Sequence, residues 1–216
     1  MMQLVLLIGV MLLVGIVGGV SGVAWLRQRA RFLALREYNR GVALLEAGQT
    51  SPAIQAFQAA LRRQPALLSA RYGMGLAYLK DRRFLDAIKL LEAVLPEKPN
   101  DAMVYCNLGW AYLSIGRLED ARVTLEKGAR INARVKELYF NLSRVFREKG
   151  DREQAIHYCR RALEIDPAYL QAQHDLNELA EIRYDAALNM ELLQQALQHF
   201  DENDTDLMIR LERGGA

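Results

Sequence analysis

Cysteine is scarce in this sequence, and neither positively nor negatively charged residues are in large excess. The two cysteines, Cys106 and Cys159, lie far apart and outside any C-x-x-C pattern, which argues against a disulfide framework and suits a reducing compartment. The formal net charge is +2, so the chain lacks the concentrated basic face expected of a nucleic-acid binder. Composition therefore disfavours a disulfide-stapled secreted domain and a nucleic-acid-binding protein.

Catalytic and metal-binding motifs are also missing. The three histidines, His157, His174 and His199, form no metal-ligand spacing with either cysteine. There is no phosphate-binding P-loop and no nucleophile elbow. Gly73-Met74-Gly75 begins like a dinucleotide-binding loop, but the third glycine is absent. We therefore expect no metal, no cofactor and no enzymatic activity.

One long apolar run is present at the start of the chain. Leu4 to Leu26 carries no charge and, at about 1.5 Å per helical residue, reaches about 35 Å, enough to cross a bilayer core of about 30 Å. Trp25 closes the run, and five arginines follow it: Arg27, Arg29, Arg31, Arg36 and Arg40. Because positive flanks stay in the cytoplasm, residues 4–26 predict a single-pass membrane anchor with the rest of the chain cytoplasmic.

A cleaved signal peptide is the rival interpretation of this run. Gly22-Val23-Ala24 offers small residues at the spacing that signal peptidase requires. The charged n-region is missing, however, the run is longer than usual, and arginines directly after the cut would hinder export. These features favour the anchor.

Glycines mark one face of the predicted span. Gly15 and Gly19, and likewise Gly18 and Gly22, form two G-x-x-x-G patterns, which let a second helix approach closely. A transmembrane helix partner or a homodimer is one interpretation. The other is that glycine is simply common in membrane helices.

The remainder of the chain repeats with a period of 34 residues. Small residues recur at Gly41, Gly75, Gly109 and Ser143. Alanine recurs at Ala53, Ala87, Ala121 and Ala155, and another small series is Ala60, Val94, Gly128 and Ala162. A bulkier series is Phe57, Leu91, Leu125 and Cys159. Prolines stand at Pro65, Pro99 and Pro167, with Ala133 in the remaining position.

Each repeat is expected to be a pair of helices joined by a short turn. Gly48, Gly116 and Gly150 mark turns, and the prolines end the second helix because they cannot continue it. The expected domains are an anchor with its basic segment at 1–30, a repeat domain at 31–183 and a C-terminal helix and tail at 184–216. The repeat domain divides into units at about 34–67, 68–101, 102–135 and 136–169, with a capping helix at 170–183.

These positions resemble the tetratricopeptide repeat family across residues 34–167. The chain departs from the pattern where Glu37 and Arg40 replace apolar residues, Ser143 replaces glycine and Ala133 replaces proline. The resemblance implies an all-α, right-handed superhelix with a concave groove that binds protein and has no catalytic activity. The layout is also similar to membrane-anchored members of the lipopolysaccharide assembly protein B type, without their metal-binding cysteine module, and to photosystem assembly factors and mitochondrial import receptors.

By that resemblance, fixed positions of each unit line the groove. In the first three units they are apolar: Leu35, Tyr38, Val42, Leu45, Tyr72, Leu76, Leu79, Met103, Cys106, Trp110 and Leu113. In the fourth they are mixed: Glu137, Phe140, Arg144, Arg147 and Glu148. The clamp of Lys, Asn and Arg with which related proteins bind acidic chaperone tails is not matched, so that class of ligand is disfavoured.

So apolar a stripe should be covered. One candidate is a protein partner that offers an amphipathic helix or an apolar extended segment, with Arg144 and Arg147 receiving its acidic end. The other is the chain itself, because Ala186, Met190, Leu193, Leu197 and Phe200 repeat at four-three spacing, and Leu207-Met208-Ile209 follows a polar hinge.

The sequence thus predicts a scaffold or adaptor at the inner face of a bacterial inner membrane, which recruits a soluble protein or helps to assemble a membrane complex. Two alternatives stay open. One is a permanent structural subunit held through its span, and the other is a regulatory subunit of a membrane-bound enzyme or protease.

Overall fold

The computed structural model describes the backbone of residues 2–180 and the side chains of residues 22–179. Every regular element in this part of the chain is a helix. In chain order the helices are α1 (Met2–Glu46), α2 (Thr50–Arg63), α3 (Leu68–Lys80), α4 (Phe84–Val94), α5 (Ala102–Ser114), α6 (Leu118–Ile131), α7 (Lys136–Glu148), α8 (Arg152–Ile165) and α9 (Leu170–Ala180). The expected all-α helical-repeat array is confirmed.

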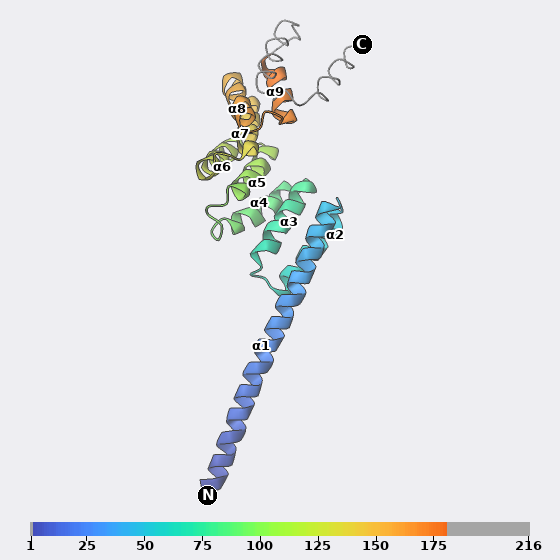
Figure 1. The fold of residues 1–216 in the computed structure, drawn as a ribbon, viewed down its shortest axis with the longest axis vertical. Helices are drawn as coiled ribbons and strands as arrows, with labels where there is room; N and C mark the ends of the chain where they lie inside the picture. Colours follow the sequence, from blue (N-terminus) through green and yellow to red (C-terminus); the bar gives the residue numbers. More distant parts are fainter. Residues whose placement is uncertain (1, 181–216) are drawn as a thin grey trace, which may run out of the picture.

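The helices form four antiparallel hairpins, α1–α2, α3–α4, α5–α6 and α7–α8, and α9 packs against the last of them. Each helix contacts the next, and the first helices of the hairpins also touch one another in the order α1, α3, α5, α7. The N-terminal part of α1 extends away from this stack as a long arm (Figure 1). The first helices therefore share one face of the array.

Turns within the hairpins use the left-handed backbone region. Gly48, Gly116 and Gly150 have φ of +75°, +75° and +77°, as expected for residues without a Cβ that end a helix. The turn of the second hairpin has Arg82 at the same step of the repeat, with φ of +58°. Arg82 is therefore the one described turn residue in this series that adopts the conformation at a steric cost.

The second helices end near prolines, although not always where expected. α2 stops two residues before Pro65, and α8 stops two residues before Pro167. α4 ends already at Val94 because Pro96 follows it, so the expectation that Pro99 closes this helix is wrong. The longer connection that results carries Lys98, which becomes part of the site described below.

Each hairpin is closed by a contact between one small and one larger side chain. A Cβ on Gly41 would lie 2.7 Å from Phe57, and one on Gly109 would lie 2.5 Å from Leu125. Only glycine allows the two helices to cross this closely. In the fourth hairpin the contact is instead between Ser143 and Cys159, whose Oγ and Sγ atoms are 3.0 Å apart. The smaller partner leaves room for serine, which explains that departure from the repeat.

The stack has a polar outer face at its first hairpin. In α7, Leu138 is fully buried and faces Gly128 of the preceding helix α6. The residues at the same step of α3 and α5, Ala70 and Val104, are also fully buried, whereas α1 has the exposed Arg36. A terminal repeat needs such a polar face because no neighbour covers it.

Glu37 and Arg40 belong to the same polar end. The Glu37 carboxylate lies 3.4 Å from the Arg36 guanidinium and 3.7 Å from that of Arg40. The three residues therefore form a small ion-pair group, and the two arginines stand where later repeats have buried apolar side chains. Their departure from the family pattern follows from the position of this hairpin at the end of the stack.

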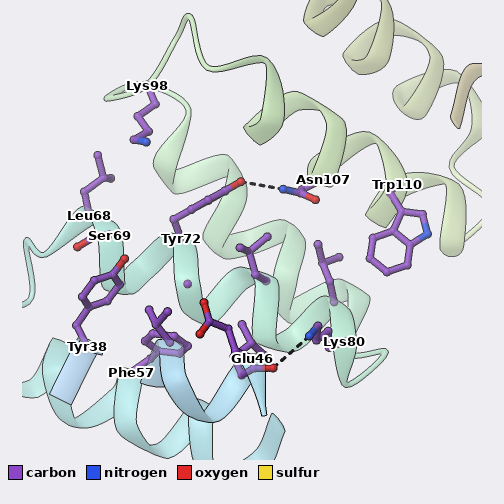
Figure 2. A pocket seen from close by; sticks show the side chains of 15 residues that line it. Tyr38, Glu46, Phe57, Leu68, Ser69, Tyr72, Lys80, Lys98, Asn107 and Trp110 are labelled. Carbon is purple, nitrogen blue, oxygen red and sulfur yellow. Dashed lines mark hydrogen bonds between the residues drawn. The ribbon is translucent and has the colours of Figure 1, made fainter. Parts of the chain in front are cut away.

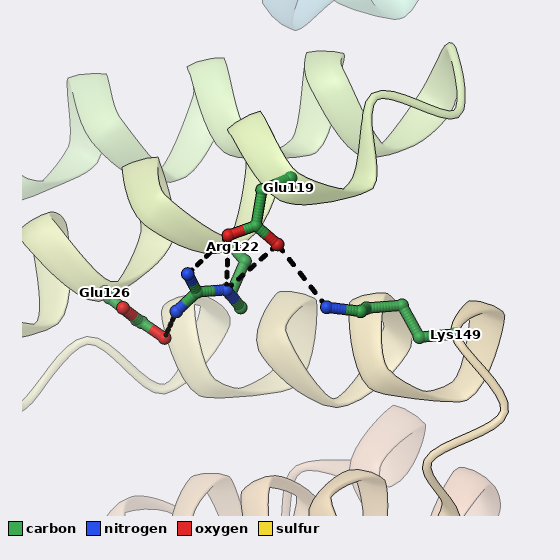
Figure 3. Close-up of polar contacts among 4 residues, drawn as sticks. All are labelled: Glu119, Arg122, Glu126 and Lys149. Atoms are coloured by element: carbon green, nitrogen blue, oxygen red, sulfur yellow. Dashed lines mark hydrogen bonds and ion pairs between the residues drawn. The ribbon is translucent and has the colours of Figure 1, made fainter.

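An ionic cluster joins the third and fourth hairpins (Figure 3). Arg122 lies between Glu119 and Glu126 on α6, and Lys149 at the end of α7 lies 3.4 Å from Glu119. The hydrogen bonds from Arg122, and then those from Lys149, lower the pKa of Glu119 to about 2. Glu119 is therefore ionised throughout the physiological pH range, although such an exposed cluster is screened by salt.

Several expectations concern residues beyond the described side chains. Gly15, Gly18 and Gly19 lie outside them, and Gly22 is the only glycine of the predicted packing face that is described, with open space around it. Within residues 22–179, whose side chains are described, no helix is both long enough and apolar enough to cross a membrane, and most of the run Leu4 to Leu26 lies outside this range. The end of the expected capping helix at 181–183 and the tail at 184–216 also lie outside the described residues.

Transplanting the contact of the fourth hairpin into the third tests the pairing rule. Gly109→Ser should lower the free energy of unfolding by about 1–3 kcal/mol through overpacking against Leu125. Leu125→Cys alone should cost roughly 2 kcal/mol through the cavity that it leaves. In the double variant, the decrease in the free energy of unfolding should be smaller than the sum of the two single decreases by at least about 1 kcal/mol, measured by urea unfolding. Ala43→Ser at an exposed position of α1 is the control, and strictly additive costs would contradict the rule.

Candidate functional site

An apolar pocket of about 800 Å³ opens on the face shared by the first helices (Figure 2). Its walls come from α1, α3 and α5, with further residues from α2 and from the connection before α5. It brings together seven of the residues expected to line a groove: Tyr38, Val42, Leu45, Tyr72, Leu76, Leu79 and Trp110. The apolar pocket therefore spans three consecutive hairpins.

The pocket exists because one step of the repeat lacks a side chain. This step is occupied by Asn39, Gly73, Asn107 and Asn141 in the four hairpins. The Asn107 amide donates to the Tyr72 hydroxyl at 2.8 Å, and the Asn141 amide donates to the Cys106 sulfur at 3.5 Å. Each of these two side chains thus bridges to the hairpin before it, whereas glycine at position 73 has none.

Phe57 explains why glycine stands at this step of the second hairpin. A Cβ on Gly73 would lie 2.8 Å from the ring of Phe57, which also fills the space beside Gly41. The ring is fully buried and forms part of the pocket wall, 6.0 Å from the Tyr38 ring centroid. The Phe57 ring therefore occupies the space that an asparagine at position 73 would need, so these two departures from the repeat occur together.

Two ammonium groups lie at the edge of the apolar pocket. The Lys80 Nζ donates to the backbone oxygen of Leu45 at 3.1 Å. The Lys98 Nζ is 5.6 Å from the Tyr72 ring centroid and 3.0 Å from an Asp101 carboxylate oxygen. Burial raises the pKa of Tyr72, so its hydroxyl stays neutral and able to form hydrogen bonds. The edge is thus polar and carries charges of both signs, Lys80 and Lys98 together with Glu46 and Asp101, while the floor is apolar.

The groove positions of the repeat pattern do not predict several residues of this pocket: Glu46, Leu68, Ser69, Lys80, Lys98 and Asn107. The asparagine series at period 34 was visible and could have revealed Asn107. Lys98 enters through the connection that Pro96 lengthens, and a pattern based on equal repeats does not predict its position. Trp110 was expected, and its ring meets Phe84 edge to face at a centroid distance of 6.1 Å.

Four expected groove residues lie elsewhere. Leu35 and Met103 are exposed, and Met103 borders a separate hollow of about 660 Å³ beside the connection before α5. Cys106 and Leu113 are buried in the packed core and do not border the apolar pocket. Burial raises the pKa of Cys106 to about 12, which keeps it a neutral and unreactive thiol.

The fourth hairpin forms a different hollow, of about 510 Å³, between α7 and α9. Phe140, Arg144 and Arg147 border it. Arg147 lies 3.3 Å from Asp175 and 3.7 Å from Glu178, both on α9, so its charge is already neutralised by the chain itself. The expectation that Arg147 receives the acidic end of a ligand is therefore not supported by its surroundings.

One group of side chains in the described region has the composition of a metal site. Ligand atoms of His174, Asp175 and Glu178 lie within 4.8 Å of one another on α9. Both carboxylates already pair with Arg147. A cation would have to displace this guanidinium, so the group is better described as an ion-pair cluster that holds α9 against α7.

Repeated hairpins of one length, with an apolar pocket on the face of their first helices, define a helical-repeat interaction protein. Family models described as Tetratricopeptide repeat match residues 38–102, 72–134 and 136–169. These matches cover more than half of the chain, which therefore belongs to the tetratricopeptide repeat family. Proteins of this family are generally binding scaffolds without enzymatic activity.

Solved structures with the same fold include bacterial relatives. A MamA protein from Desulfovibrio magneticus is 26% identical with a TM-score of 0.59, over 63% of this chain and 77% of that one. A thermophilic tetratricopeptide protein of Thermus thermophilus is 25% identical with a TM-score of 0.62, over 82% and 96%. The APC/C Cut9–Hcn1 hetero-tetramer is similar in fold alone, at 19% identity and a TM-score of 0.63, over 68% and 29%. Comparison with curated proteins gives no match.

Giving the second hairpin the packing of the third should close the apolar pocket. The double change Phe57→Leu and Gly73→Asn copies the Leu91 and Asn107 arrangement, so we expect a folded chain with a similar melting temperature. The native chain should bind the apolar anionic dye 1-anilinonaphthalene-8-sulfonate in this pocket, and the variant should bind it at least about five-fold more weakly, by fluorescence titration. Val123→Asn on the exposed side of α6 is the control. Unchanged dye binding in the double variant would contradict this assignment.

Proposed function

We propose that this chain is a membrane-anchored tetratricopeptide scaffold that binds another protein through the apolar pocket. The observation that carries the proposal is the continuity of the pocket across α1, α3 and α5. A pocket that spans three neighbouring helices suits an elongated ligand better than a compact one. The ligand class that fits is an amphipathic helix or an apolar extended segment of a protein.

The chemistry of the pocket supports this ligand class. Leu76 and Trp110 offer half-buried apolar surface, which a partner's apolar side chains would remove from water. Lys80 at the edge, whose ammonium group donates to a neutral backbone oxygen, favours an acidic residue that flanks the apolar stretch. Tyr38 and Ser69 add hydroxyls that can bind the polar atoms of a partner.

The long arm of α1 supports anchoring to a membrane. The helix continues without a break from the first hairpin to Met2, and it includes the apolar run Leu4 to Leu26. Trp25 and the arginines after it are exposed, as expected at a lipid headgroup layer, where each arginine near the surface adds about 1 kcal/mol of attraction to anionic lipid.

This arrangement would place the repeats on the cytoplasmic side of a bacterial inner membrane. There the scaffold would recruit a soluble protein or help to assemble a membrane complex. The layout is similar to that of lipopolysaccharide assembly protein B, without its metal module, and the resemblance carries over the layout only.

Photo-crosslinking in living cells tests the binding site. A crosslinking amino acid at Leu76 or Trp110 should join the chain to one recurrent protein, identified by mass spectrometry. The same amino acid at Val123, which is exposed on α6, is the matched control and should not do so. Because burying a charge under an apolar partner is costly, Leu76→Asp, at a half-buried position of the pocket, should remove the crosslink at Trp110. Equal crosslinking from Val123 and Trp110 would argue against a specific pocket.

Membrane fractionation tests the anchor. The full chain should stay in the membrane pellet after extraction at alkaline pH and require detergent for release. Added protease should digest the repeats in inverted vesicles and not in intact spheroplasts. Replacing Val14 and Val17 by arginine should release the chain, because each arginine at a span centre costs about 3 kcal/mol. Recovery of the native chain in the soluble fraction would refute the anchor.

A further inference from the structure

The groove on the first-helix face is apolar in one part and positively charged in another, and a segment elsewhere in the same chain has the complementary properties. Residues 22–40 of α1 contain five exposed arginines and a single acidic residue, Glu37. The apolar pocket begins beside them at Tyr38. The first-helix face therefore offers an apolar floor that adjoins a basic end.

The sequence after α9 has the complementary order. Ala186, Met190, Leu193, Leu197 and Phe200 repeat at four-three spacing, which predicts an amphipathic helix. Directly after this stripe the segment 201–206 carries four acidic residues and no basic one. An apolar stretch followed by a negative one matches a groove whose apolar floor leads to a positive end.

The length of chain after α9 allows the two to meet. Neighbouring packed helices lie about 8–10 Å apart, so the path from α9 past α7 and α5 is about 30 Å to α3 and up to about 40 Å to α1. Residues 181–185 can span up to about 17 Å, and residues 186–200 would extend about 22 Å as a helix. The acidic segment would then arrive near Arg36 and Arg40, whose side chains are 65% and 69% exposed.

We infer that residues 186–206 of this chain occupy its own groove: the apolar stripe lies in the pocket between α1, α3 and α5, and the acidic segment pairs with Arg36 and Arg40. The inference rests on the proposed function, because it makes the tail a competitor of the protein partner for the same site. A partner must displace the tail, so its apparent affinity equals its intrinsic affinity multiplied by the fraction of molecules whose groove is empty.

Trp110 provides the readout, because it lines the pocket and Trp25 is the only other tryptophan. In full-length chains carrying Trp25→Phe, the double change Leu193→Asp and Leu197→Asp should shift Trp110 emission to longer wavelength by exposing the ring to water. Gln194→Asp with Gln198→Asp adds the same charge beside the stripe and is the matched control, with emission unchanged. Identical emission from all three chains would overturn the inference.

A synthetic peptide of residues 185–206 separates occupancy within one chain from other arrangements. It should restore Trp110 emission in the Leu193→Asp and Leu197→Asp chain, at a concentration at least about ten-fold lower than that needed to bind the chain with the native tail. Arg36→Gln with Arg40→Gln should weaken the peptide about three-fold or more at low ionic strength. If the peptide binds equally well to the chain with the native tail and to the Leu193→Asp and Leu197→Asp chain, the inference is overturned. Trp110 emission that depends on protein concentration also overturns it, because this would indicate that the tail of a second copy fills the pocket.

The crosslinking experiment at Trp110 reports separately on the proposed function. If cells yield a recurrent partner while the tail variants leave Trp110 emission unchanged, the proposed scaffold function is supported and the occupancy of the groove by the tail is refuted. If the peptide behaves as expected but no partner is captured, even from cells expressing the Leu193→Asp and Leu197→Asp chain, the proposal that a partner binds in this pocket is refuted. The proposed competition between partner and tail is then refuted as well.

Discussion

The close crossing of two helices within each hairpin is the constraint on which the rest of the structure depends. Gly41 and Gly109 permit it by leaving space for Phe57 and Leu125, and Ser143 permits it because Cys159 is small. Where the two helices cross closely, the first helices of successive hairpins can also touch and form a continuous face. The apolar pocket, its polar edge and its length across three hairpins follow from that face.

The two ends of the stack are finished differently. At the first hairpin, Arg36 and Arg40 replace buried apolar residues and leave a face that needs no neighbour. At the last, α9 is held against α7 by the pairs of Arg147 with Asp175 and Glu178. The described array is therefore closed by charged groups at both ends, and the apolar pocket lies between these ends.

Much of the fold could be predicted from the sequence, because a period of 34 residues fixes the order of helices and glycine marks three of the turns. The site could be predicted only in part. Seven groove residues meet in the pocket, but Cys106 and Leu113 turn into the core, and Arg147 finds partners on α9. Those outcomes depend on pairs of residues in different helices, such as Phe57 with Gly73, which a periodic pattern does not reveal.

The unbroken course of α1 has a mechanical consequence. Ala34 is fully buried in the stack, while Trp25 lies on the arm of the same helix, and no glycine or proline separates the two. A helix without such a joint resists bending, since a sharp kink requires an interruption in its hydrogen bonds. The arm and the first hairpin must therefore tilt and rotate as one rigid body. Any partner or membrane that holds the arm in one orientation thus also sets the orientation of the binding face.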